Sequence, residues 1–260
     1  MTIHFVGAGP GAADLLTLRA VEALRTADVC LYAGTYLDEG VLDHCRPDAR
    51  LVDTQHLDLD GIIAELAEAH AAGLEVVRLC SGDPSLYSAL AEQTRRLDAA
   101  GVPWDVVPGV PAYAAAAAEL GVELTVPELV QSVVLTRVQA RSTAMPSTES
   151  LENFAATGAT LVLHLAITRI REIAERLVPT HDADCPVAVV SNASRPHRVE
   201  LRGTLADIAD AVEGAGLRQA AVILVGRALE RPGTAESWLY ASDPEREAKR
   251  RTLDPVDRQR

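Results

Sequence analysis

The stretch Ile3–Gly11, which reads IHFVGAGPG, runs from a short aliphatic segment directly into a glycine-rich loop. A short aliphatic run is typical of a buried strand in a parallel sheet. Glycines let a ligand approach the backbone closely because they carry no Cβ atom. The loop departs from the dinucleotide-binding fingerprint, since the second predicted strand ends at Leu31-Tyr32-Ala33 without an acidic residue to hold a ribose. Alone, this stretch predicts a strand followed by either a tight turn or a ligand-binding loop.

Strand and helix patterns alternate along the rest of the chain. Aliphatic runs predict strands at Ile3–Val6, Val29–Tyr32, Arg50–Asp53, Glu75–Cys80, Trp104–Val107, Ser132–Thr136, Thr160–His164, Val187–Ser191, Val199–Arg202 and Ala221–Val225. Apolar residues at helical spacing predict helices at Leu18–Leu24, Ile62–His70, Leu86–Leu97, Pro111–Leu120, Thr148–Ala155, Thr168–Leu177 and Leu205–Val212. The alternation predicts an α/β fold with mainly parallel sheets covered by helices.

A break between two such series suggests two domains. The segment from Gly121 to Glu128 contains Pro127, which would end a helix, and the strand pattern restarts after it. We therefore expect an N-terminal α/β domain at 1–120, a linker at 121–130 and a C-terminal α/β domain at 131–240. Residues 241–260 mix both charges with almost nothing apolar, which predicts a mobile tail.

Composition and charge narrow the class of protein. The formal net charge of −13 disfavours binding to nucleic acid or to an anionic membrane, which needs a basic face. Met1–Val6 has no basic segment before its apolar run, and no long apolar stretch follows, so we expect neither a signal peptide nor a membrane span. Cys30, Cys45, Cys80 and Cys185 form no CxxC pair. This scatter predicts reduced thiols in a cytoplasmic protein without a metal site.

Two further loops follow predicted strands in the first half of the chain. One contains Ser81-Gly82-Asp83-Pro84, in which Asp83 suits a helix N-cap and Pro84 the first helical position. The other is Pro108-Gly109-Val110-Pro111-Ala112. In open α/β sheets, ligands bind at the carboxyl ends of the strands. Three small-residue loops at one such edge therefore predict a site for a small molecule.

These three loops resemble the signatures of the tetrapyrrole methylase family. The first signature spans Gly7–Gly11 and Asp14–Leu18, the second Ser81–Tyr87 and the third Pro108–Ala112. Within the family, the chain most resembles the branch that methylates carbon 11 of precorrin-4. The segments that carry this likeness are Leu31–Gly34, Leu124–Glu128, Gln131–Arg137 and Gly216–Ala220. The segment Met145–Leu151 and the amino-acid sequence of Gly109–Ala112 resemble the aerobic, metal-free version of that branch.

The resemblance implies two α/β domains with S-adenosylmethionine in the cleft between them, within a homodimer. It implies C-methylation of precorrin-4 at carbon 11, giving precorrin-5 in cobalamin biosynthesis. Carried over position by position, it implies donor contacts from Pro10, Ser81, Gly82, Asp83, Leu86, Pro111, Ala112, Leu165, Ala193, Ala220 and Ala221. The chain departs from its relatives at Pro111-Ala112, where hydroxyl residues are common, and at Arg195-Pro196-His197, where Trp-Pro and an acidic residue are common.

The acceptor side is less defined. Arg137 and Arg141 follow a second-half strand, and guanidinium groups suit the carboxylates of a tetrapyrrole, although surface solvation also explains them. His56 and His164 could contact the tetrapyrrole or fill the core, and Tyr32 and Tyr87 could pack on the donor or fill the domain. No residue is forced into the role of general base.

Three alternatives stay open from the sequence. One is the cobalt-precorrin-4 version of the enzyme, and another is a tetrapyrrole methylase with a different acceptor. The third belongs to a different class, namely an NAD- or nucleotide-binding oxidoreductase or binding module.

Overall fold

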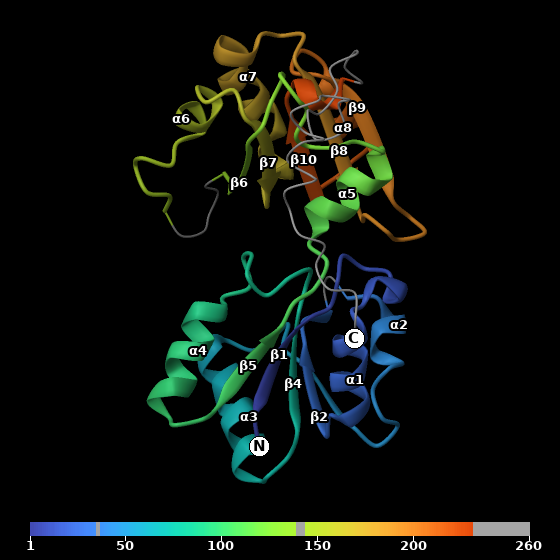
Figure 1. Cartoon of the computed structure of the whole chain (residues 1–260), viewed down its shortest axis with the longest axis vertical. Helices are drawn as coiled ribbons and strands as arrows, with labels where there is room; N and C mark the ends of the chain where they lie inside the picture. The colour runs from blue at the N-terminus through green and yellow to red at the C-terminus, as the bar shows by residue number, and fades with distance from the viewer. Residues whose placement is uncertain (35–36, 139–143, 231–260) are drawn as a thin grey trace, which may run out of the picture.

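The computed structural model describes residues 1–34, 37–138 and 144–230, which form two five-stranded sheets one above the other (Figure 1). The first sheet contains β1 (Ile3–Gly7), β2 (Val29–Tyr32), β3 (Arg50–Asp53), β4 (Val76–Cys80) and β5 (Trp104–Val107). Its strand order is β3-β2-β4-β1-β5, and every pair is parallel. The parallel sheet expected in the first half is therefore confirmed.

Helices cover both faces of the first sheet. The helices of this half are α1 (Leu18–Thr26), α2 (Glu39–Leu42), α3 (Leu59–Ala71) and α4 (Leu90–Ala99), with the short 3-10 helix η1 (Ala13–Leu15) before α1. Phe5 packs in one cluster with Leu66 of α3 and Leu97 of α4, whereas Val6 packs in another with Leu24 of α1. Neighbouring residues of β1 thus point to opposite faces, as strand geometry requires.

The second sheet is mixed. It contains β6 (Val133–Arg137), β7 (Thr160–His164), β8 (Pro186–Ser191), β9 (Val199–Thr204) and β10 (Ala221–Val225), in the order β6-β7-β10-β8-β9. Only β6 and β7 form a parallel pair, so this sheet departs from the mainly parallel arrangement that we expected. The cause lies in the connections. Strands β7 and β8 run the same way because a helix joins them, but β10 inserts between them in the opposite direction. The connection of β8 to β9 is too short for a parallel crossover.

Helices also cover both faces of the second sheet. One face carries α6 (Leu151–Ala155), α7 (Ile170–His181) and α8 (Ile208–Gly214), and the 3-10 helices η3 (Ile167–Arg169) and η4 (Arg227–Leu229) lie beside its strands. The other face carries α5 (Ala112–Leu120), whose Ala116 and Leu120 pack against Val190 and Leu224 (Figure 1). The domain boundaries stay a prediction, and α5, which we expected to end the first domain, packs against the second sheet.

Each strand and helix expected from the sequence is present, five of the strands with the predicted ends and the other elements with shifted ends. The four-residue helix α2 was not predicted, since so short a segment shows no helical period. Helix α4 begins at Leu90 rather than Leu86, because Tyr87 and Ala89 have φ values of 56° and 55°, which an α-helix excludes. Among the described residues, no helix is both long and apolar enough to cross a membrane. The predicted tail at 241–260 lies outside the described residues.

Candidate functional site

The three small-residue loops meet at one point because β4, β1 and β5 are neighbours in the first sheet. The loops after β1 and β4 are joined by hydrogen bonds, as Gly82 N donates to Gly9 O at 2.8 Å and Gly9 N donates to Gly82 O at 3.1 Å. A Cβ atom on Gly109 would lie 2.2 Å from Gly82 O, and one on Gly7 would lie 2.5 Å from Gly109 Cα. Gly7 and Gly109 are therefore required for contact between loops, which for Gly7 is a different role from the ligand approach that we inferred for the first loop.

Asp83 connects the second loop to the third. One carboxylate oxygen accepts a hydrogen bond from Ser85 N at 2.9 Å and another from the Ser85 hydroxyl, and the other oxygen accepts from Gly109 N at 2.8 Å. The expectation that Asp83 caps a helix is wrong, because α4 starts later in the chain. Burial alone would raise the pKa of Asp83, but the hydrogen bonds from Ser85 and Gly109 outweigh it and hold the pKa below its usual value.

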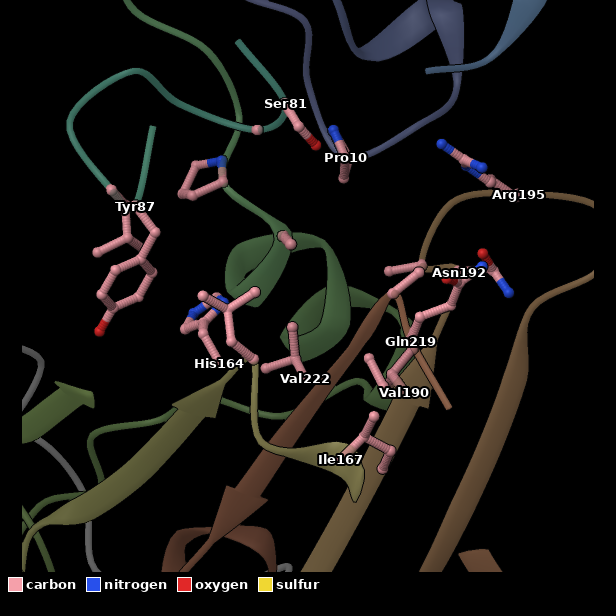
Figure 2. A pocket seen from close by; sticks show the side chains of 18 of the residues that line it. Pro10, Ser81, Tyr87, His164, Ile167, Val190, Asn192, Arg195, Gln219 and Val222 are labelled. Atoms are coloured by element: carbon pink, nitrogen blue, oxygen red, sulfur yellow. The ribbon is translucent and has the colours of Figure 1, made fainter. Parts of the chain in front are cut away.

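A cavity of about 360 Å³ lies between this loop junction and the second sheet (Figure 2). The sequence-predicted donor contacts all line it, namely Pro10, Ser81, Gly82, Asp83, Leu86, Pro111, Ala112, Leu165, Ala193, Ala220 and Ala221. The structure thus brings these residues together from both halves of the chain. Their binding of a methyl donor stays a prediction.

The second sheet contributes through one edge. The carboxyl ends of β7 and β8 lie beside the amino end of β10, because β10 runs in the opposite direction between them. His164 ends β7 and Leu165 follows it, Asn192 and Ala193 follow β8, and Ala220 precedes β10. Antiparallel insertion of β10 therefore explains why residues that start a strand join residues that end strands in one cavity.

Several lining residues have left-handed backbone conformations. Tyr87, Leu165, Asn192 and Ala220 have φ values of 56°, 53°, 51° and 52°. Such values are costly for residues with a Cβ atom and persist where the surrounding structure fixes them, commonly at functional sites. Here each of the four turns the chain sharply at the edge of the cavity.

Other lining residues were not among the predicted donor contacts. They are Tyr87, His164, Ile167, Thr168, Val190, Asn192, Arg195, Arg218, Gln219 and Val222. The sequence leaves Tyr87 and His164 open as either ligand-contacting or core residues, and the structure places both at the cavity. Most of the remaining lining residues lie next to a predicted strand end, and this was the sequence feature that could have identified them. That feature alone does not show that the strand ends converge on one cavity.

Contacts between the two halves frame the cavity. Ala12 N donates to the Ser194 hydroxyl at 3.0 Å, and a Cβ atom on Gly11 would lie 2.5 Å from Arg195 Nε. The rings of Tyr87 and His164 contact each other with their centroids 5.6 Å apart. Burial is the main cause that raises the pKa of the Tyr87 phenol, and burial also lowers the pKa of the His164 imidazole. At neutral pH the phenol is therefore protonated and the imidazole is neutral.

The predicted acceptor residues lie elsewhere or outside the described residues. Arg137 ends β6 in register with His164. It also lines a second cavity of about 210 Å³, together with Val138, Met145, Pro146, Ser147, Glu149, Ser150, Leu151 and Arg176. Arg141 lies outside the described residues. Tyr32 and His56 do not line either described cavity.

Comparison with known proteins gives the chain its relatives. Residues 2–209 match the family of tetrapyrrole (corrin/porphyrin) methylases. The chain is 55% identical to a precorrin-4 C(11)-methyltransferase of Rhodococcus erythropolis, over 95% of this chain and 99% of the relative. It resembles the solved structure of a cobalt precorrin-4 methyltransferase, with a TM-score of 0.85 and 35% identity, covering 88% of this chain and 96% of that one. It also resembles a uroporphyrin-III C-methyltransferase of Thermus thermophilus in complex with S-adenosylhomocysteine, with a TM-score of 0.75 and 29% identity, covering 91% and 97%.

Proposed function

The chain belongs to the family of tetrapyrrole (corrin/porphyrin) methylases, and from this premise we propose that it methylates carbon 11 of precorrin-4 with S-adenosylmethionine as donor, giving precorrin-5 in cobalamin biosynthesis. The observation that carries the proposal is the cavity between the two sheets, where residues from six separate segments beside strand ends converge. A relative named for this activity shares 55% identity over nearly the whole chain. The likeness to a structure that holds S-adenosylhomocysteine supports the choice of donor.

The cavity suits a donor that needs positioning more than chemical activation. A sulfonium methyl group is already reactive, so the protein must hold it in line with the acceptor carbon and exclude water. Alignment of this kind can supply about 7–11 kcal/mol of the barrier. Backbone groups of Gly82, Pro111 and Ala112 can approach a ligand closely, and the loop junction that Asp83 holds fixes where they stand. We therefore expect small residues, rather than a group of charged side chains, to position the donor.

We place the tetrapyrrole next to the donor, over the carboxyl ends of β6 and β7. Arg137 lies in register with His164, so it flanks the donor cavity on the neighbouring strand. Its guanidinium suits a substrate carboxylate, which a chain with a net charge of −13 must bind through local cations. Arg141, four residues further along the sequence, is proposed as a second cation for the substrate carboxylates.

The metal-free substrate is favoured over its cobalt counterpart. Identity to the precorrin-4 relative is 55%, whereas identity to the cobalt precorrin-4 methyltransferase of known structure is 35%. We further infer a homodimer, which the family resemblance implies, in the cytoplasm and without a metal, as the scattered cysteines indicate. The acidic net charge supports the absence of binding to nucleic acid or membranes.

The proposal is tested with purified protein, S-adenosylmethionine and precorrin-4, by measuring product mass and release of S-adenosylhomocysteine. We expect a gain of one methyl group. Ala112→Phe places a phenyl ring in the cavity at the start of α5, so it should weaken binding of S-adenosylhomocysteine and reduce turnover at least about tenfold. Ala118→Phe, on the exposed side of the same helix, is the matched control and should retain both.

The alternatives give different results. Methylation of cobalt-precorrin-4 or uroporphyrinogen III in place of precorrin-4 would keep the donor site and replace the acceptor. Full activity of Ala112→Phe would move the donor site away from this cavity. Binding of NAD without binding of S-adenosylhomocysteine would contradict the whole proposal and favour a nucleotide-binding module.

A further inference from the structure

Methylation of a tetrapyrrole carbon leaves a proton to be removed, and the cavity holds one group suited to take it. We propose that His164 is the catalytic base of the reaction, an inference that rests on the proposed function. As the ring carbon attacks the sulfonium methyl, a carbon–carbon bond forms, and the sulfur–carbon bond breaks with its electron pair left on sulfur. The adjacent ring nitrogen becomes a cationic iminium, and its N–H proton passes to the imidazole. The products are a neutral imine, the thioether and an imidazolium.

The position of His164 fits this role. It is the last residue of β7, and the left-handed Leu165 then turns the chain away, which leaves the imidazole at the edge of the cavity (Figure 2). Two aromatic rings hold it from different elements. Tyr87 follows β4 with its ring centroid 5.6 Å away, and Tyr113 of α5 makes an edge contact at 6.4 Å. The imidazole is thereby fixed between the two halves of the chain, next to the proposed donor contacts.

The hydrogen-bonding state of His164 is unusual for a half-buried side chain. Its Nε2 atom is buried without a hydrogen-bond partner. Most buried polar atoms in folded proteins have a partner, and each one that lacks a partner calls for an explanation, of which a catalytic role is one. An imidazole held by ring packing alone keeps a nitrogen lone pair available for the N–H group of an acceptor.

Other ionisable groups that line the cavity are unsuited to accept a proton. Both carboxylate oxygens of Asp83 already accept hydrogen bonds, and its pKa lies below the usual value. Burial raises the pKa of Tyr87, so its phenol stays protonated. Arg195 and Arg218 are cations at neutral pH. Among the described residues that line this cavity, His164 alone carries an imidazole.

The protonation state also agrees. The groups that contact the His164 ring from neighbouring elements are Tyr87 and Tyr113, and Arg137 is its partner in the strand register on β6. Burial lowers the pKa of His164, so the imidazole is neutral at pH 7 and ready to accept a proton. Leu165 beside it is 63% exposed, so the cavity opens to solvent next to His164.

The test compares single-turnover methyl transfer in the wild-type protein, His164→Gln and His164→Ala, with whichever tetrapyrrole the wild type methylates. Glutamine keeps a hydrogen-bonding side chain but accepts no proton, so its rate should fall by about 10²–10⁴-fold. Both variants should keep the wild-type melting temperature and still bind S-adenosylhomocysteine, which shows that they fold and keep the donor site. Added imidazole should restore part of the rate of His164→Ala, because a free base can occupy the vacated space.

A second histidine provides the matched control. His181 on α7 also has a buried nitrogen without a partner and a pKa lowered by burial, but it does not line the cavity. His181→Gln should keep the wild-type rate.

The pH dependence of the rate gives a second measurement. The wild-type rate should fall as the pH drops through the pKa of His164, which lies below the usual value of about 6.5. The low rate of His164→Gln should not change over this range.

The outcomes separate this inference from the proposed function. A wild-type protein that methylates no tetrapyrrole would overturn both. A wild-type protein that methylates precorrin-4, with an equal rate and the same pH profile in His164→Gln, would overturn the role of His164 alone. A slower His164→Ala that imidazole does not rescue would also overturn it, since His164 would then act only by packing.

Discussion

Both carboxylate oxygens of Asp83 are engaged, one by the turn at Ser85 and the other by Gly109 on the neighbouring loop. The sequence indicates that Asp83 is important, but it suggests the wrong role for its side chain. An aspartate before a proline is typical of a helix N-cap, and here the same acceptor capacity is used across two loops. A single sequence shows that a carboxylate needs donors nearby, but it does not show which distant amide supplies them.

We predict that Asp83→Asn lowers the free energy of unfolding by about 1 kcal/mol at neutral pH, since hydrogen bonds to a charged acceptor are strong but this side chain is partly exposed. The pKa of Asp83 is depressed in the folded state, so its contribution is complete above the unfolded pKa of about 3.9 and is lost as the pH falls through the lower folded value. Urea unfolding of wild type and variant from pH 7 to pH 3 should therefore show a difference that shrinks only at the acid end.

The exposed Asp60, which pairs with Arg96 on the surface, provides the control for Asp83. Asp60→Asn should change stability by less than about 0.5 kcal/mol. A difference between wild type and Asp83→Asn that stays constant down to pH 3 would show that the Asp83 charge does not hold the loops.

Secondary-structure elements were the most predictable level, because periodicity is local. The strands β2, β3, β5, β7 and β10 have the ends that their aliphatic runs predict. The start of α4 was missed because two left-handed residues, Tyr87 and Ala89, interrupt a segment with good helical spacing. Nothing in the residue types of Tyr87 and Ala89 indicates that conformation, since the contacts that fix it come from elsewhere in the fold.

The junction of the loops after β1, β4 and β5 depends on residues without side chains. We predict that Gly109→Ala destabilises the protein by about 1–3 kcal/mol and weakens binding of S-adenosylhomocysteine, because its Cβ atom would lie 2.2 Å from Gly82 O and 2.8 Å from Gly7 Cα. Both contacts are to backbone atoms, so a loop must move. Thermal melting and calorimetric titration measure the two effects.

Gly214→Ala is the matched control, since no atom lies within 4 Å of the added Cβ at the end of α8. It should leave donor binding unchanged and stability equal or slightly higher. Wild-type donor affinity in Gly109→Ala would show that the loop junction is not what positions the donor.

At the scale of the whole molecule, the cavity depends on how strand directions combine. The carboxyl edge of the first sheet was predictable, because repeated strand–helix alternation predicts parallel strands. The contribution of Ala220 and Ala221 follows from the antiparallel insertion of β10, which periodicity cannot show, and those positions came from family resemblance instead. The sequence also does not predict that α5 packs against the second sheet, since an alanine-rich helix suits any close-packed face.

A ligand bound between the two halves should stabilise both, and this gives a prediction for the whole chain. At a hundredfold excess over its dissociation constant, S-adenosylhomocysteine should add about 2.7 kcal/mol to the free energy of unfolding and raise the melting temperature by about 5–10 °C, whereas NAD should have no effect.

Ser194→Ala removes the hydroxyl that accepts a hydrogen bond from Ala12 N across the halves at 3.0 Å, so it should weaken binding of S-adenosylhomocysteine about fivefold. Ser132→Ala, at an exposed serine before β6, should not. Equal stabilisation of wild type and Ser194→Ala would mean that the donor does not need the two halves held together, and stabilisation by NAD instead would place a nucleotide in the cavity.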